Sequence, residues 1–121
     1  PVWVVEQNGA QLVVGHPQYL QQIDAIAQEQ TLFDGGADTK WSDRASCDKR
    51  VPATGAGYSQ AHYDGLLARY RRAGLPVFVV EYACAAANVK EAYARSKRLG
   101  YIPYVTRRPL SRLTTTPPPG Y

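Results

Sequence analysis

The chain has 121 residues, of which 45% are hydrophobic and 20% charged, with a net charge of +4. The length suits one ordinary domain, and the composition excludes an intrinsically disordered chain. No stretch approaches the ~20 consecutive apolar residues of a transmembrane helix, so we predict no membrane span.

The positive charge lies in residues 61–121, which hold ten basic and three acidic side chains. Such an imbalance raises the hypothesis of a nucleic-acid-binding module. Seven of the ten basic residues, however, fall on predicted helices, where they are typical of a solvated face. Because no aromatic and basic residues interleave as in RNA-recognition motifs, we predict no nucleic-acid partner.

Residues 2–5 are β-branched and aromatic and predict a first strand, which ends at a polar cluster beginning with Glu6. A short helix is predicted over 17–22, and a second strand over 23–28 ends at Glu29. Residues 34–58 combine Gly, Asp, Ser, Pro and Thr without a period, which predicts a long loop.

Ser59 is predicted to cap an amphipathic helix that ends at Gly74. Residues 77–82 form the clearest strand of the sequence. A further helix is expected from about residue 86 to residue 99, with Gly100 as its stop signal. The last strand is predicted over 101–106, although Pro103 lacks the N–H that a central strand needs.

Alternating strands and helices of this kind favour parallel strands joined by helical crossovers. We therefore predict the α/β class and, more finely, a partial (β/α)₈ TIM barrel that contains roughly its last four βα units. The predicted barrel part is residues 1–113, and residues 114–121 form a Pro-rich tail. The start at Pro1 and the lack of any Met suggest a missing N-terminal half. A small open α/β sheet is the competing architecture.

Two carboxylates end neighbouring predicted strands. Glu29 is in line with Ile23 and Ala27, and Glu81 with Val77 and Val79, so each could continue a row of residues lining a barrel interior. Paired carboxylates at such strand ends are the usual equipment for glycoside hydrolysis. The alternatives are a solvated loop acid for Glu29 and an ion pair with a strand-end arginine for Glu81.

Other polar and aromatic residues lie near the predicted strand ends. Gln7 and Asn8 can hydrogen-bond sugar hydroxyls, although Asn-Gly is equally a turn signal. Tyr82 and Tyr104 can stack on sugar rings, but the period points Tyr82 outward, where packing against helices is the alternative. Arg107 completes the predicted substrate-binding group.

Cys47 and Cys84 fit no metal-ligand spacing, so we predict no metal site. Both lie in loops that follow strand ends on the same predicted face. Either they are unrelated small residues or they form a disulfide, which a secreted protein would retain.

Four segments together carry a resemblance to glycoside hydrolase family 114, the endo-α-1,4-polygalactosaminidase-like group. They are QNG (7–9), IDAIAQEQTLF (23–33), GLPVFVVEYA (74–83) and GYIPYVTRRPL (100–110). In order, they resemble successive strand ends of these barrels across nearly all of residues 1–113.

The resemblance implies an endo-acting hydrolase of a galactosamine-containing α-1,4-linked polysaccharide, located outside the cell or in its envelope and needing no cofactor. It implies that Glu29 is one of two catalytic carboxylates and that Glu81 is a further site acid. The partner carboxylate has no counterpart here, so we expect this chain alone to be inactive. A non-catalytic carbohydrate-binding barrel is the alternative function.

Overall fold

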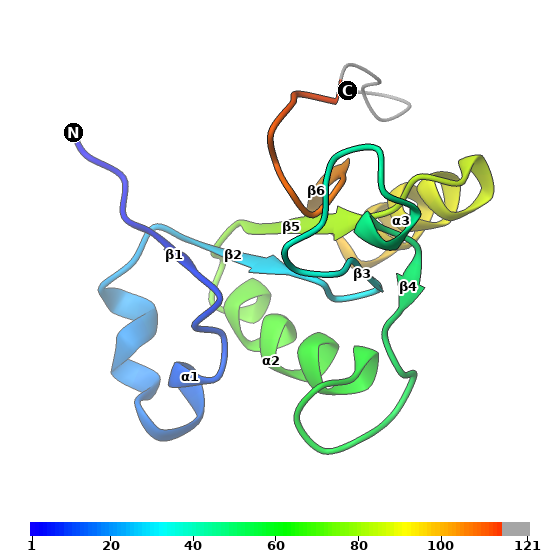
Figure 1. Cartoon of the computed structure of the whole chain (residues 1–121). Helices are drawn as coiled ribbons and strands as arrows, with labels where there is room; N and C mark the ends of the chain where they lie inside the picture. Colours follow the sequence, from blue (N-terminus) through cyan, green and yellow to red (C-terminus); the bar gives the residue numbers. More distant parts are fainter. Residues whose placement is uncertain (115–121) are drawn as a thin grey trace.

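The structure is a computed structural model that describes residues 1–114. Its elements in chain order are β1 (Val5–Gln7), α1 (Leu12–Gly15), the 3-10 helix η1 (Pro17–Gln21), β2 (Ala25–Glu29), β3 (Phe33–Asp34), the 3-10 helix η2 (Arg44–Ser46), β4 (Lys49–Arg50), α2 (Gln60–Arg72), β5 (Val77–Tyr82), α3 (Ala86–Leu99) and β6 (Ile102–Thr106). Four strands form a parallel sheet in the order β1-β2-β5-β6, and β3 pairs antiparallel with β4 (Figure 1). The predicted α/β class with parallel strands is confirmed.

The helices begin and end where the sequence signals lie. The Ser59 hydroxyl accepts a hydrogen bond from the His62 amide at 3.2 Å and so caps α2. Gly74 (φ 83°) and Gly100 (φ 73°) follow α2 and α3 in the left-handed region, which glycine adopts without a steric cost. Strand β5 and helix α3 have the bounds that the sequence predicts.

Two sequence predictions need correction, and a third concerns residues that the structure hardly describes. The first strand occupies Val5–Gln7 rather than 2–5, because ladder pairing with β2 begins only at Val5. The expected loop over 34–58 contains η2 and β4, which pairs with β3. The Pro-rich tail lies almost entirely outside the described residues. Pro103 is tolerated because β6 is an edge strand of the described sheet.

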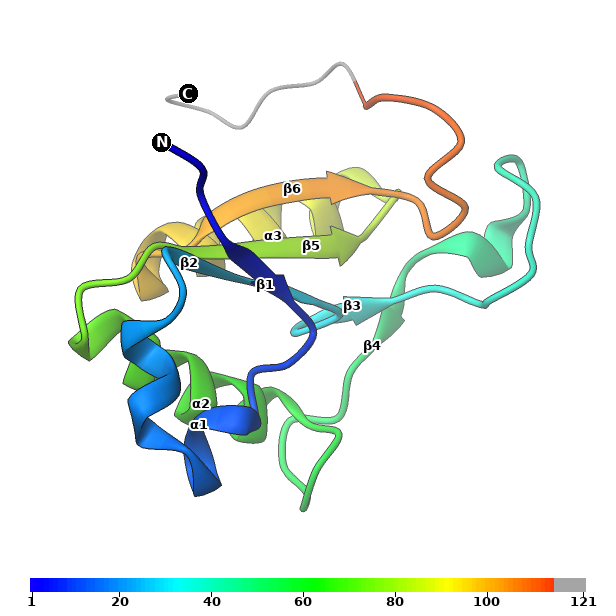
Figure 2. The ribbon, with the colours of Figure 1, turned by 90° about the vertical axis from the view of Figure 1, so that its left-hand side faces the viewer.

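The strand order follows the chain without reversal. Right-handed crossovers between parallel strands in such an order place every connecting helix on the same face of the sheet. Figure 2 agrees, with α1 and α2 together on one side of the sheet. Among residues 1–114, no helix is long and apolar enough to cross a membrane.

The helix-covered face holds the core. Val77 and Val79 of β5 pack with Leu67 and Tyr70 of α2, and a second cluster joins Val105 of β6 to α3. All of these strand residues are at most 1% exposed. Burial of apolar area against α2 and α3 therefore holds the sheet to its helices.

The opposite face carries apolar side chains that no described helix covers. In register, Phe78 lies beside Ile102, and Val80 beside Tyr104. These side chains are half-buried, or exposed in the case of Ile102. The chain after β6 returns to this face, where the Thr114 amide donates to the Tyr104 hydroxyl at 2.9 Å. We call this surface the open face.

Candidate functional site

The carboxyl ends of β1, β2 and β5 meet at one edge of the sheet. Asn8 directly follows β1, while Glu29 and Tyr82 are the last residues of β2 and β5. Glu29 is paired in register with Val80, so it points to the same face as Tyr82, two residues further on. Polar groups from three neighbouring strands therefore converge on the open face at this edge.

Both oxygens of the Glu29 carboxylate accept hydrogen bonds. The Asn8 side-chain amide donates to Oε2 at 2.8 Å, and the Tyr82 hydroxyl donates to Oε1 at 2.5 Å. The orientation of Asn8 is fixed in turn, because its Oδ1 accepts from the Glu29 amide at 2.9 Å and from Gln28 Nε2 at 3.1 Å. The Glu29 carboxylate is half-buried but still reachable by solvent. We call Asn8, Glu29 and Tyr82 the strand-end triad.

Backbone geometry at the strand ends supports the triad. Asn8 (φ 62°) and Gln30 (φ 59°) both adopt the left-handed region, which Asn tolerates better than Gln. Such outliers persist where surrounding contacts fix the backbone, and they concentrate at functional sites. Asn8 therefore both forms the turn and contacts Glu29 with its side chain. The turn and the polar contact, given as alternatives for this residue, occur together.

Tyr82 is completely buried, and the Arg108 guanidinium lies 5.4 Å from the centroid of its ring. Burial first, and then the hydrogen bond to Glu29, raise the pKa of Tyr82 above its usual value, while Arg108 opposes this. The phenol therefore remains a neutral donor to Glu29. The prediction that Tyr82 points outward, toward the helices, is wrong, because the helix-covered face is the one that carries Val77 and Val79.

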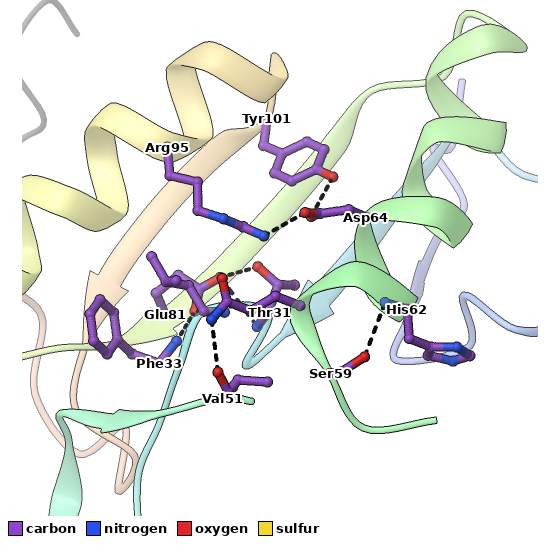
Figure 3. A network of polar contacts seen from close by, with 11 residues as sticks. Thr31, Phe33, Val51, Ser59, His62, Asp64, Glu81, Arg95 and Tyr101 are labelled. Atoms are coloured by element: carbon purple, nitrogen blue, oxygen red, sulfur yellow. Dashed lines mark hydrogen bonds and ion pairs between the residues drawn. The ribbon is translucent and has the colours of Figure 1, made fainter. Parts of the chain in front are cut away.

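Glu81 is in register with Val105 of the core and so lies on the helix-covered face. Figure 3 shows it beside Thr31 and Phe33. Its carboxylate is 1% exposed and accepts hydrogen bonds from the amides of Leu32 and Phe33, each at 2.9 Å. The Thr31 amide (3.2 Å) and hydroxyl are further donors. Three successive amides thus form a cradle that this carboxylate fills. Burial raises the pKa of Glu81, and the hydrogen bonds from Phe33, Thr31 and Leu32 oppose this rise.

The expectation that both carboxylates line one interior is therefore wrong. Alternation within each strand was correct, but period alone does not say which row faces the helices. The predicted ion pair between Glu81 and Arg107 or Arg108 is also absent among the described residues, where the Glu81 hydrogen bonds come from the loop after β2. The charge of Arg95 on α3 still favours the ionised form of Glu81.

Arg95 itself belongs to a second polar group between α2 and α3. Its guanidinium pairs with Asp64 at 2.7 Å, and the Tyr101 hydroxyl donates to the same carboxylate at 3.2 Å (Figure 3). This group links α2 and α3 to Tyr101, the residue that follows the C-cap Gly100 of α3. We interpret it as part of the structural framework, because it joins α2 to α3 on the helix-covered side.

The remaining predicted binding residues are spread along the edge. Gln7 is exposed and pairs in register with Ala27, so it belongs to the open face. Tyr104 also lies on the open face, with its hydroxyl engaged by Thr114. Arg107 donates from Nη1 to the Trp41 carbonyl at 2.8 Å and so holds the loop before η2.

Sequence reasoning missed three groups near the strand ends. Gln28 is buried, with an Oε1 that has no hydrogen-bond partner among the described residues. Asp34 accepts from the Tyr58 hydroxyl at 2.9 Å, and burial followed by this bond raises the pKa of Tyr58. The sequence suggests Arg108 only as an ion-pair partner for Glu81. The pair of arginines directly after β6 is the sequence signal that could have identified Arg108.

Cys47 and Cys84 form a disulfide with a Cα–Cα distance of 5.9 Å, which is the second of the two alternatives that the sequence leaves open. Asp48 stands beside it and accepts hydrogen bonds from the Cys84 amide at 2.9 Å and the Ala85 amide at 3.1 Å. Because Ala85 offers no side-chain cap, Asp48 caps α3 from another segment. Cys47, Asp48 and Cys84 also hold potential metal-ligand atoms within 4.8 Å, but the disulfide occupies both sulfurs.

No family model matches the chain. An uncharacterized protein of Deinococcus radiodurans is 33% identical over 118 residues, which cover 95% of this chain and 32% of that protein. The chain thus spans about a third of the length of the curated relative it matches. No solved structure matches.

Proposed function

We propose that the chain is part of a (β/α)₈ barrel in which the open face lines the interior. Helices on a single face and consecutive parallel strands are the arrangement of a barrel wall. The half-buried apolar residues of the open face need further strands to cover them. The much greater length of the Deinococcus radiodurans relative leaves room for such strands in a longer protein.

Within this barrel, we infer a glycoside hydrolase related to family 114 that cleaves a galactosamine-containing α-1,4-linked polysaccharide. The observation that carries the proposal is the Glu29 carboxylate, held by Asn8 and Tyr82 at the carboxyl edge of the sheet. Catalytic groups of barrel enzymes lie at this edge. The substrate itself rests on the sequence resemblance.

The geometry suggests which half of the chemistry Glu29 performs. Both of its oxygens accept hydrogen bonds, and these hold the carboxylate in a fixed orientation at the strand end. An ionised carboxylate acts as a nucleophile or as a base toward water, whereas the proton donor must be a second acid. That acid would come from an earlier strand of the barrel.

The disulfide supports an oxidising compartment, in keeping with a protein outside the cell or in its envelope. A polymer too large to enter the cell would be met there. The proposal of an extracellular location rests on this bond and on the resemblance.

The test uses the full-length protein with poly-α-1,4-galactosamine and its N-acetylated form. We expect wild type to shorten at least one polymer and Glu29→Gln to bind it without cleaving it, since Gln keeps the shape but cannot ionise. Arg98→Gln, at an exposed position in the last turn of α3, is the control. Binding without cleavage by wild type would support the carbohydrate-binding barrel instead, and neither binding nor cleavage would overturn both.

A further inference from the structure

Gln28 is a buried amide that directly precedes Glu29, the carboxylate inferred to react. Its side chain is 5% exposed and lies in the same row of β2 as the core residue Ile26. Within residues 1–114, its Oε1 has no hydrogen-bond partner. A buried acceptor without a partner lowers stability, so its presence in a native fold calls for an explanation.

The network around Asn8 determines which end of each side-chain amide faces which neighbour. The Glu29 backbone amide can only donate, so the Asn8 atom that it meets at 2.9 Å must be the acceptor Oδ1. The Asn8 Nδ2 group then faces the Glu29 carboxylate, to which it donates at 2.8 Å. Gln28 in turn presents Nε2 to Asn8 Oδ1 at 3.1 Å and to the Glu29 carbonyl at 3.2 Å. Its Oε1 is thereby turned away from this network.

The turn that carries Asn8 has a second support. Glu6 Oε2 accepts a hydrogen bond from the Gly9 amide at 2.9 Å. A Cβ at Gly9 would displace the Glu6 carboxylate, so glycine at this position preserves the contact. Glu6 therefore holds the backbone of the turn, whereas Gln28 holds the Asn8 side chain. The contact from Gln28 is the one that acts on the group donating to Glu29.

We propose that Gln28 is a positioning residue, which orients the Asn8 amide and, through Asn8, the Glu29 carboxylate for the reaction at the strand ends. The inference rests on the proposed function, because it assigns Gln28 a role in the reaction of Glu29. The unpartnered Oε1 follows from this role. An apolar side chain of similar size would fill the same space without a buried acceptor, but it could not hold Asn8. The fold thus sacrifices some stability to fix the geometry of the site.

Gln28→Met tests this role, because methionine has a similar length and no amide. In the full-length protein, kcat on the polymer that wild type cleaves should fall roughly ten- to a hundredfold, because a misplaced reacting group slows the chemical step. KM should change less than about threefold, since Gln28 does not bind the substrate. The melting temperature should stay within about 3 °C of wild type or rise, because the buried acceptor is removed together with the bonds of Nε2.

Gln60→Met is the matched control. Gln60 also donates from Nε2 to a backbone carbonyl, that of Val51 at 2.8 Å, and it lies outside the strand-end triad. Its substitution should lower the melting temperature and leave kcat unchanged, because it removes a hydrogen bond without creating a better-packed core. A purely structural Gln28 would behave as Gln60 does. A larger loss of melting temperature in Gln28→Met than in Gln60→Met would therefore contradict the inference.

A double-mutant cycle tests whether Gln28 acts through Asn8. Asn8→Ala removes the donor to Glu29 and should lower kcat at least as much as Gln28→Met. Adding Gln28→Met to Asn8→Ala should then change kcat by less than about twofold, because the residue through which Gln28 acts is already absent.

The side-chain order of Asn8 gives a measurement that does not depend on the reaction. With ¹⁵N-labelled asparagine in the full-length protein, the Asn8 side-chain resonance is identified by its loss in Asn8→Ala. Its order parameter should fall in Gln28→Met and stay unchanged in Gln60→Met.

Wild-type kcat in Gln28→Met, or a full additional loss in the double variant, would overturn the inference while the proposed function stands. If wild type cleaves no polymer, or Glu29→Gln cleaves as well as wild type, the proposed function is wrong. The order parameter then decides separately, because an Asn8 amide that is equally rigid in wild type and Gln28→Met would overturn the role of Gln28 as well.

Discussion

Glu29 and Glu81 are carboxylates near the ends of neighbouring strands, and yet they occupy opposite faces of the same sheet. Glu81 faces the helices, is almost fully buried, and is satisfied by backbone amides. Glu29 is half-buried on the open face, and within residues 1–114 its carboxylate accepts hydrogen bonds from the side chains of Asn8 and Tyr82.

The source of the donors separates a structural role from a chemical one. Backbone amides fix Glu81 as part of the loop over residues 31–33, so that its charge has no freedom to meet a substrate. Side-chain donors orient Glu29 while leaving one part of the carboxylate open to solvent. The comparison predicts that substitutions at the two positions have different consequences.

The largest stability effect is expected for Glu81→Ala. Removing this carboxylate leaves the amides of Leu32 and Phe33 and the Thr31 hydroxyl buried without an acceptor. The free energy of unfolding should therefore fall by about 3–5 kcal/mol, as it does when other buried charge networks lose one member. Urea denaturation measures it, and a loss below about 1 kcal/mol would show that the cradle is not needed.

Breaking the disulfide should have the next largest effect. The bond closes a loop with a sequence separation of 37 residues. Its loss in a Cys47→Ser, Cys84→Ser double variant should lower the unfolding free energy by about 3–4 kcal/mol. Comparison of wild type with and without a reductant is the independent measurement. Equal stability in both would contradict a stabilising role for this bond.

Asp48→Asn should weaken the cap on α3 by about 1–2 kcal/mol at neutral pH. Burial acts to raise the pKa of Asp48, but hydrogen bonds from Cys84, Asn88 and Ala85 together lower it below its usual value. The folded state therefore binds the proton less readily than the unfolded chain does. The stabilisation is present above the usual aspartate pKa and is lost as pH falls through the lower, folded-state value.

Unfolding of wild type and Asp48→Asn at pH 7 and at about pH 2, well below the usual aspartate range, tests this sign. The difference between the two proteins should shrink in acid. A difference that grows as pH falls would show that Asp48 is stabilising in its protonated form.

The smallest effect is expected for Tyr82→Phe, which keeps the buried ring and removes the hydroxyl from Glu29. Stability should change by about 0.5–1.5 kcal/mol, the net value of one hydrogen bond. In the full-length protein, kcat should also fall, because Glu29 would lose one of the two donors that orient it. An unchanged kcat would remove Tyr82 from the site.

Much of the fold could be predicted from local signals. The caps Ser59, Gly74 and Gly100 act within one turn of chain, so the bounds of α2 and α3 follow from sequence. The apolar run of β5 is also sufficient to define its ends. By contrast, the short strand β4 contains only Lys49 and Arg50, and it forms because these residues pair with β3, which lies earlier in the chain. No local sequence signal marks it.

The site was harder to predict, because its geometry is non-local. Glu29, Asn8 and the strand-end position were identified, but the faces of Glu81 and Tyr82 were exchanged. Which row of β5 is buried depends on the side that α2 and α3 occupy, and this follows from the handedness of crossovers rather than from period. The amides that satisfy Glu81 lie about 50 residues away in the chain.

The most direct test compares Glu29→Gln and Glu81→Gln in the full-length protein, with activity and melting temperature measured on the same samples. We predict that Glu29→Gln lowers kcat by about 10²–10⁴ without a large change in melting temperature. Glu81→Gln should lower the melting temperature but leave the folded protein active. A stable Glu81→Gln without activity, or a fully active Glu29→Gln, would contradict the assignment of the two carboxylates.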